Sequence, residues 1–259
     1  MLDYPTFKQM AGELTGIDLS NYKSQQMDRR INSLMQIWGI NSYDDFYETL
    51  KTNPQKYKEF VKRLTINVSE FFRNSERFFE LWTHILPELL QKTPLVRIWS
   101  AGCSDGAEPY SIAIILRELQ AENRAKIIAT DVDKIILDKA REARYAINEI
   151  KSLPPELIQK YFNEDNRFYV LKDEIKNKVE FRPHNLLVDP YEKNLDLIIC
   201  RNVVIYFTDQ AKSVLYNKFY ESLKPGGYLM VGGTEPLLNY RQMGFENPMT
   251  SFYRKPNSL

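Results

Sequence analysis

The feature that most constrains the fold is a regular alternation of short β-type runs with helical stretches, which begins near residue 95. The runs with strand character are Leu95–Ala101, Ala125–Asp131, Leu195–Cys200 and Gly227–Gly232. Helical patterns follow the first three runs, near 109–119, after Val132 and over 209–223. Strands that alternate with helices in this way predict βαβ units, and therefore an α/β domain with a mostly parallel sheet.

The chain before this alternation is helical in pattern. Apolar residues recur at helical spacing in two stretches, which are Ile31, Leu34, Met35 and Trp38 in one and Phe60, Val61 and Leu64 in the other. Gly39 marks a break between helices, and Asn41 or Ser42 is placed to cap the next one. The sequence therefore divides into a helical N-terminal domain over residues 1–75 and an α/β domain over residues 76–259.

One stretch interrupts the α/β rhythm. Residues 154–183 contain a short helix from Pro154 to Tyr161 and two short strands, Arg167–Leu171 and Val179–Pro183. A charged linker separates the two strands. We expect this stretch to form a small antiparallel β-subdomain inserted into the larger domain.

Charge and cysteine content exclude several classes of protein. The chain has 35 Lys and Arg against 34 Asp and Glu, a net charge of +1, which disfavours a nucleic-acid-binding coat. No segment reaches the ~18 apolar residues that span a bilayer, and the first residues do not resemble a secretion signal. The two cysteines and two histidines form no metal motif. We expect a cytoplasmic protein without metal, membrane insertion or nucleic-acid partner.

A glycine-containing turn follows the first strand. Ala101, Gly102 and Gly106 lie where backbone can approach a ligand at the carboxyl edge of the sheet. The G-x-x-x-G spacing differs from the G-x-G-x-x-G dinucleotide fingerprint, and no Gly-Lys-Ser/Thr follows, so a phosphate loop is disfavoured. A tight turn without any ligand is the alternative.

Polar residues also end the second and third strands. Asp131 can accept hydrogen bonds from a ribose diol, although it can equally cap the helix after Val132. Together with the glycine turn it predicts an adenosine-type ligand, better suited to S-adenosyl-L-methionine (SAM) than to NAD. Arg201 and Asn202 follow the third strand and suit a pocket wall. The Asn/Asp-Pro-Pro-aromatic tetrapeptide of many N-methyltransferases is absent.

Taken in order, these segments resemble the CheR family of chemotaxis receptor methyltransferases along essentially the whole chain. The matching segments are Asn67–Arg73, Arg97–Ser104, Gly106–Ser111, Ala129–Asp131, Asn185–Leu187, Cys200–Asn202, Tyr206–Phe207 and Pro225–Leu229. The resemblance implies a Rossmann-like SAM-dependent methyltransferase domain with a helical N-terminal domain and an inserted β-subdomain. It implies methyl esterification of glutamate side chains on bacterial chemoreceptors, which yields S-adenosylhomocysteine.

The resemblance also implies which residues form the site. SAM contacts are expected at Asn67, Ser69, Arg73, Ala101, Gly102, Glu108, Asp131, Val132, Asn185, Leu186, Arg201 and Asn202. Ser69 stands where the family often has Thr, and Asp105 and Ala107 also depart from its pattern, while Glu108 is retained.

Two residues are expected to act in catalysis. A glutamate carboxylate has a pKa of about 4.3, so it is ionised at neutral pH and needs no general base. The enzyme then has to align the carboxylate with the sulfonium methyl and exclude water. Arg73 is expected to bind a carboxylate, either that of SAM or that of the target glutamate. Tyr206 is expected to line the transfer channel, with a core role as the alternative.

Partners follow from the resemblance and from charge. Family members that tether to a C-terminal receptor pentapeptide have a longer Gly-x-Gly hairpin loop, whereas Asn163–Arg167 is short and lacks glycine, so we expect no tethering. Basic residues that could dock acidic receptor helices are Lys23, Arg29, Arg30, Lys56, Lys58, Lys62 and Arg63. We expect a monomer.

Three other functions are the alternatives to chemoreceptor methylation. They are a non-catalytic SAM-sensing module that binds a partner, a small-molecule methyltransferase and, more distantly, an NAD-dependent oxidoreductase.

Overall fold

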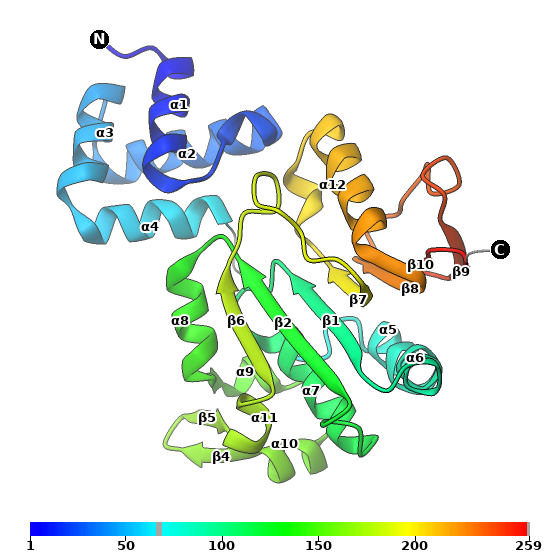
Figure 1. Cartoon of the computed structure of the whole chain (residues 1–259). Helices are drawn as coiled ribbons and strands as arrows, with labels where there is room; N and C mark the ends of the chain where they lie inside the picture. Colours follow the sequence, from blue (N-terminus) through cyan, green and yellow to red (C-terminus); the bar gives the residue numbers. More distant parts are fainter. Residues whose placement is uncertain (66–68, 258–259) are drawn as a thin grey trace. The chain divides into compact units, whose positions relative to one another are not determined.

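A computed structural model describes residues 1–65 and 69–257, and its chain divides into two compact units (Figure 1). The first unit comprises Met1–Asn67 together with Tyr206–Ser213. The second comprises Val68–Ile205 and Val214–Leu259. The domain bounds expected from the sequence, 1–75 and 76–259, stay a prediction.

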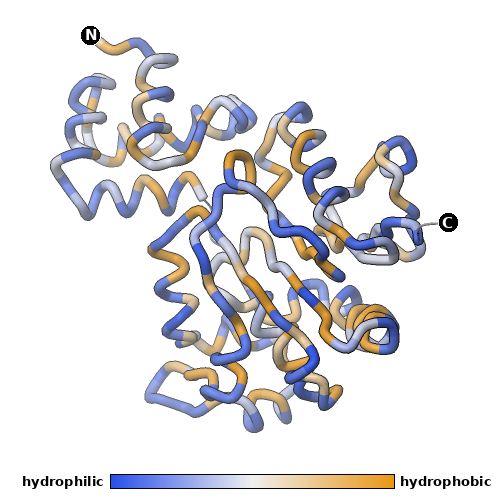
Figure 2. Tube along the Cα trace, viewed as in Figure 1, coloured by the Kyte–Doolittle hydropathy of each residue, from blue (hydrophilic) through white to orange (hydrophobic). Residues whose placement is uncertain are grey.

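The first unit is helical. Its α-helices before residue 66 are α1 (Tyr4–Thr15), α2 (Ser24–Trp38), α3 (Tyr43–Thr52) and α4 (Pro54–Thr65), with a 3-10 turn at Leu19–Asn21 between the first two. Ser42 caps α3 by accepting a hydrogen bond at Oγ from the amide of Asp45 (3.1 Å). Hydrophobic and hydrophilic residues alternate along α3 and α4 (Figure 2). Their apolar faces meet at Phe46, whose ring lies 5.7 Å from that of Phe60.

A segment from far along the chain completes this unit. Tyr22 and Phe207 form an antiparallel bridge, and their rings lie 5.0 Å apart. The amide of Lys23 donates to the carbonyl of Tyr206 (2.9 Å), and the amide of Thr208 donates to that of Asn21 (2.9 Å). The helical N-terminal domain is therefore discontinuous in sequence.

The second unit contains a seven-stranded sheet in the order β6-β2-β1-β7-β8-β10-β9. Its strands are β1 (Val96–Ala101), β2 (Ala125–Asp131), β6 (Val179–Pro183), β7 (Leu195–Cys200), β8 (Leu223–Val231), β9 (Glu246–Met249) and β10 (Phe252–Arg254). The first five are parallel to one another, whereas β10 is antiparallel to both β8 and β9. The predicted mostly parallel α/β sheet is confirmed.

Helices cover both faces of this sheet. The helices after residue 74 are α5 (Ser75–Glu80), α6 (Leu86–Lys92), α7 (Ala107–Glu118), α8 (Lys134–Glu142), α9 (Ile147–Ile150), α10 (Pro155–Tyr161), α11 (Asp173–Lys176) and α12 (Asp209–Ser222), with a π-helical turn at Leu81–Ile85 and a 3-10 turn at Val204–Tyr206. Tyr206 and the first residues of α12, up to Ser213, belong to the first unit. Alternate side chains of β1 point to opposite faces. Ile98 lies in the hydrophobic core with α7, whereas Trp99 packs its ring 5.6 Å from Phe219 of α12.

The small antiparallel sheet differs from the predicted one. It has three strands in the order β3-β5-β4, which are β3 (Arg144–Ala146), β4 (Phe162–Asp165) and β5 (Phe168–Leu171). The predicted second strand, Val179–Pro183, is instead β6, which pairs parallel with β2 at the edge of the large sheet. That prediction is wrong because β6 buries Val179 there and packs the ring of Phe181 5.4 Å from Tyr110 of α7.

Candidate functional site

The site-forming residues of the second unit gather where the parallel strands end. The chain runs outward from β1 through β2 to β6 and then returns to β7 on the other side of β1. This reversal between β1 and β7 is a topological switch point, where α/β sheets bind ligands beyond the carboxyl ends of their strands. Gly102, Asp131 and Arg201 lie at the three adjacent strand ends of β1, β2 and β7.

The turn after β1 requires glycine at position 102. Gly102 has φ +84°, a left-handed conformation that favours glycine. A Cβ at this position would lie 2.4 Å from Cγ2 of Val203, so the turn also packs closely against the loop after β7. The amides of Gly102 and Cys103 both donate to the carbonyl of Thr130 (2.8 and 2.9 Å), which ties the turn to the end of β2.

Asp131 ends β2 with its carboxylate almost completely buried, at 8% exposure. Its Oδ2 accepts from the amide of Ser104 (2.8 Å) and its Oδ1 from the amide of Asp133 (3.0 Å). Burial raises the pKa of Asp131 to about 6, against these hydrogen bonds, which lower it. The alternative role predicted for Asp131 was to cap the next helix. The structure shows that Asp133 caps that helix instead, because its carboxylate accepts from the amides of Ile135 and Ile136. Asp131 is therefore not committed to capping α8.

Glu108 and Arg201 form a buried pair across the switch point. Nη1 of Arg201 lies 3.6 Å from Oε2 of Glu108, and the two side chains are 2% and 13% exposed. Oγ of Ser100 donates to the other carboxylate oxygen of Glu108 (2.8 Å). Burial raises the pKa of Glu108 and lowers that of Arg201, while the attraction between the two charges opposes both shifts. The pair fixes the first turn of α7 against the end of β7.

Arg201 also holds the segment that carries Arg73. Its Nη2 donates to the carbonyl of Arg73 and to Oδ1 of Asn74, both at 2.7 Å. Phe72 and Asn74, on either side of Arg73, have φ of +49° and +59°, which are costly conformations for residues with side chains. Strain of this kind persists only where surrounding contacts enforce it, so the backbone at Arg73 is held in place.

The predicted pair Asn185 and Leu186 follows β6 at the same edge. The amide of His184 donates to the carbonyl of Asp131 (2.9 Å), and Leu186 is buried. Oδ1 of Asn185 accepts from the amide of Leu187 (3.0 Å), and its own amide donates to Asp189 (2.8 Å). The turn after β6 is therefore attached directly to the end of β2.

The remaining predicted residues are distributed as follows. Ala101, Val132 and Asn202 lie at the ends of β1, β2 and β7 with the residues above, and Ser69 precedes the Arg73 segment. Asn67 lies outside the described residues. Tyr206 belongs to the first unit, where the guanidinium of Arg30 lies 4.9 Å from the centre of its ring.

Three buried side-chain polar atoms lack a hydrogen-bond partner among the described residues, and all three follow strand ends at this edge. They are Oγ of Ser104 after β1, Nε2 of His184 after β6 and Nε of Arg201 after β7. Buried polar groups are rarely left unpaired in native proteins. The atoms of Ser104 and Arg201 follow the two strands that flank the switch point, where they suit a polar ligand such as the ribose, amino and carboxylate groups of SAM. The ring of His184 instead follows the edge strand and packs 5.4 Å from that of Trp99.

The sequence interpretation missed Ser100 and Glu235. Glu235 is 5% exposed, and its carboxylate accepts from backbone amides of the loop after β7. The signal was present, because Glu235 follows the fourth predicted strand at the same edge as the residues that were identified.

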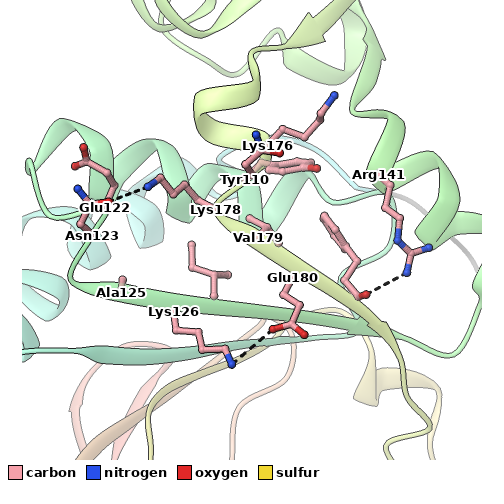
Figure 3. Close-up of a pocket in the computed structure, with 13 residues that line it drawn as sticks. Tyr110, Glu122, Asn123, Ala125, Lys126, Arg141, Lys176, Lys178, Val179 and Glu180 are labelled. Atoms are coloured by element: carbon pink, nitrogen blue, oxygen red, sulfur yellow. Dashed lines mark hydrogen bonds and ion pairs between the residues drawn. The ribbon is translucent and has the colours of Figure 1, made fainter.

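A groove in the second unit lies away from these strand ends. It encloses about 730 Å³ beside the first residues of β2 and β6. Figure 3 shows the side chains that line it. Lys178 hydrogen-bonds to Asn123 there, and Lys126 pairs with Glu180. These positions lie at the end of β2 opposite Asp131, so the groove is separate from the strand-end site.

Comparison with known proteins identifies relatives of both units. The family model for the CheR methyltransferase SAM binding domain matches residues 67–252, and that for the CheR methyltransferase all-alpha domain matches residues 2–65. Proteins named chemotaxis protein methyltransferase from Listeria innocua and Listeria monocytogenes are each 38% identical over 254 residues, which is 98% of this chain and 97% of theirs. A protein of the same name from Borreliella burgdorferi is 36% identical over 93% of this chain and 89% of its own.

Proposed function

The chain belongs to the CheR methyltransferase family and is a SAM-dependent methyltransferase of chemoreceptor glutamates, and on that premise we propose how its residues carry out the reaction. The observation that carries the proposal is that two unpaired buried polar atoms, on Ser104 and Arg201, follow the two strands that flank the switch point. In this proposal Asp131 holds the ribose diol of SAM, and the Gly102 turn admits the cofactor close to the backbone. Asn67, Ser69, Glu108, Val132, Asn185, Leu186, Arg201 and Asn202 complete the cofactor site.

The reaction needs no proton acceptor on the enzyme. An oxygen of the ionised glutamate attacks the methyl carbon of SAM, the carbon–sulfur bond breaks, and its electron pair neutralises the sulfonium. The products are the glutamyl methyl ester and S-adenosylhomocysteine. The protein contributes alignment of oxygen, carbon and sulfur and exclusion of water. Arg73, whose backbone is held by Arg201, binds a carboxylate through its planar guanidinium. Tyr206 lines the path of the methyl group.

Calorimetric titration with S-adenosylhomocysteine tests the cofactor site, with NADH as the control ligand. We expect a dissociation constant near the micromolar range, about 8 kcal/mol of binding free energy, and no heat from NADH. Incubation with receptor and SAM then yields a product that releases methanol in base, as a glutamyl ester does and an N-methyl group does not. Absence of S-adenosylhomocysteine binding to a folded sample contradicts the proposed site.

The first unit offers a basic surface for the receptor. Arg29, Arg30 and Arg63 line, with Ser33, a cavity of about 440 Å³ between α2 and α4. We propose that this cavity receives acidic side chains near the methylated glutamates, which makes the helical N-terminal domain, predicted over residues 1–75, the receptor-docking domain and the α/β domain the SAM-binding domain.

Charge reversal at the cavity is expected to weaken receptor binding alone. Arg29→Glu combined with Arg63→Glu should raise the KM for receptor about tenfold at low salt, because like charges replace attraction, with a smaller effect at high salt. The affinity for S-adenosylhomocysteine should not change. Lys58→Glu combined with Lys62→Glu makes the same charge change on two exposed residues of α4 that do not line the cavity, so this double variant is the matched control. Equal receptor KM values for all three proteins exclude the cavity as a docking site.

The hairpin of the small sheet supports methylation without a tether. Asp165 pairs with Phe168, so only Asn166 and Arg167 form the turn, and Asn166 adopts φ +57°. We expect a labelled peptide with the last five residues of a tethering receptor to show no saturable binding in fluorescence polarisation up to millimolar protein. Tight binding contradicts this expectation.

Two coarser properties accompany the proposal. Among residues 1–65 and 69–257, no helix is both long and apolar enough to cross a membrane. We propose that the enzyme acts in the cytoplasm as a monomer on the cytoplasmic helices of its receptors.

A further inference from the structure

Glu235 lies at a position that none of the proposed roles uses. It follows β8, is 5% exposed, and directs its carboxylate at backbone amides rather than at solvent. Oε2 accepts from the amides of Asn202 (2.5 Å) and Gly232 (3.1 Å), and Oε1 accepts from the amide of Ile205 (3.0 Å). One side chain therefore satisfies amides at both ends of the loop that follows β7.

That loop joins several parts of the proposed cofactor site. Arg201 at its start pairs with Glu108 and donates to the carbonyl of Arg73. Val203 in its middle occupies the space that a side chain on residue 102 would need. Asn202 has φ +60°, a conformation that the bond from its amide to Glu235 helps to enforce. The position of the loop therefore sets the position of three separate contacts.

Gly232 makes the approach of Glu235 possible. A Cβ on residue 232 would lie 2.3 Å from Oε2 of Glu235 and 3.1 Å from the amide nitrogen of Asn202. A side chain at this position would therefore displace the carboxylate. The contact of Glu235 with the loop after β7 therefore depends on glycine at position 232.

We propose that Glu235 is a positioning residue for methyl transfer, which fixes the loop Arg201–Ile205 in the conformation that binds SAM. The inference rests on the proposed cofactor site, because it assigns Glu235 an effect on SAM through Arg201, Asn202 and Val203 rather than through direct contact. The role belongs to the carboxylate, because one of its oxygens accepts two amides and the other a third. An amide side chain of the same shape offers a single acceptor oxygen.

Two variants test this role by different routes. Glu235→Gln keeps the volume but places an NH2 group against a backbone donor, and Gly232→Ala leaves Glu235 intact but pushes it from the loop. Each is expected to weaken S-adenosylhomocysteine binding and to raise the KM for SAM by about tenfold, because buried amides lose their acceptor. The KM for receptor should stay within about twofold, and Glu235→Asp, which keeps the charge, should recover part of the affinity.

Asp196 supplies the matched control. It is also a buried carboxylate, at 5% exposure, which accepts from the amide of Arg97 (2.7 Å) and pairs with Lys224, but it lies at the start of β7. Asp196→Asn is expected to lower the melting temperature and leave the affinity for S-adenosylhomocysteine unchanged. A purely structural Glu235 would behave in the same way, so unchanged affinity in folded Glu235→Gln overturns the proposal.

Hydrogen exchange on the wild-type protein keeps the proposal testable if both variants fail to fold. Without ligand, the amides of Asn202 and Ile205 should exchange at least about a hundredfold more slowly than unstructured amides. Exchange at unstructured rates overturns the proposal. If the wild-type protein shows protected amides yet binds no S-adenosylhomocysteine, the proposed cofactor site fails while the loop-holding contact stands, so the two failures are distinguishable.

Discussion

Replacing Arg73 with alanine is expected to lower kcat/KM about a hundredfold and to leave the protein folded. A guanidinium that binds a carboxylate inside a protein contributes about 3 kcal/mol, and each 1.4 kcal/mol is a factor of ten in rate. The fold survives because Arg201 holds the segment through the carbonyl of Arg73 and through Asn74, both of which remain in the variant. Steady-state methylation of receptor, with circular dichroism as the folding check, measures the effect.

Two further variants refine the Arg73 result. Arg77→Ala removes a guanidinium from the next helical turn that pairs with Glu80 at 2.6 Å and with Glu76 at 3.2 Å, and it should change kcat/KM by less than about threefold. Arg73→Lys keeps the charge but loses the planar fork, so intermediate activity indicates bidentate binding. Near-normal turnover of a folded Arg73→Ala variant rules out the assigned role.

Affinity for S-adenosylhomocysteine is expected to fall as the pH falls through about 6. Burial raises the pKa of Asp131 to about 6, and only the ionised carboxylate accepts both hydrogen bonds of a ribose diol. The ligand therefore binds the ionised form, and at pH 5 the apparent dissociation constant should be about tenfold larger than at pH 7.5. Titration calorimetry in a series of buffers measures this, and a dissociation constant that is constant from pH 7.5 to 5 contradicts the role of Asp131.

The sign of the stability effect separates this loss from acid unfolding. Because the pKa of Asp131 is higher in the folded chain than its usual 3.8, the folded state takes up the proton first. This group alone therefore makes the fold more stable as the pH falls from about 6 toward 3.8. His184, whose amide donates to the carbonyl of Asp131, has a pKa lowered by burial, and Glu108 and Asp133 are further acids of this region with little exposure. Asp131→Asn identifies the group, because it should bind weakly at every pH and lose the dependence near 6.

Most residues at the strand ends could be located from the sequence, because functional residues of parallel sheets lie beyond the carboxyl ends of the strands. The hydrophobic runs located β1, β2, β7 and β8, and the polar residues that follow them located Gly102, Asp131 and Arg201 without any knowledge of contacts. The same rule would have found Glu235 had it been applied to the fourth strand. This rule could not identify Ser100, because a serine inside a strand has no distinguishing sequence pattern. Its role follows only from its hydrogen bond to Glu108 in the structure.

Strand pairing in the inserted region was not predictable in the same way. A short run of apolar residues shows that a strand exists but not which strand it joins. Val179–Pro183 pairs with β2 because the ring of Phe181 packs against that of Tyr110 on α7. These two residues are 71 positions apart in the sequence. β3 has only three residues, too few for a periodic pattern, and its place beside β5 follows from the contacts of the folded chain.

The discontinuity of the helical unit has a consequence for protein synthesis. Helices α1 to α4 leave the ribosome long before the segment around Phe207 that packs against Tyr22. At about 5–20 residues per second, roughly seven to thirty seconds separate the end of α4 from Phe207. During that interval the helices emerge without the segment that completes their unit, and most of the parallel sheet is synthesised meanwhile. The domain that begins first in the sequence is therefore among the last to be finished, and an expression plasmid that stops at residue 67 encodes an incomplete unit.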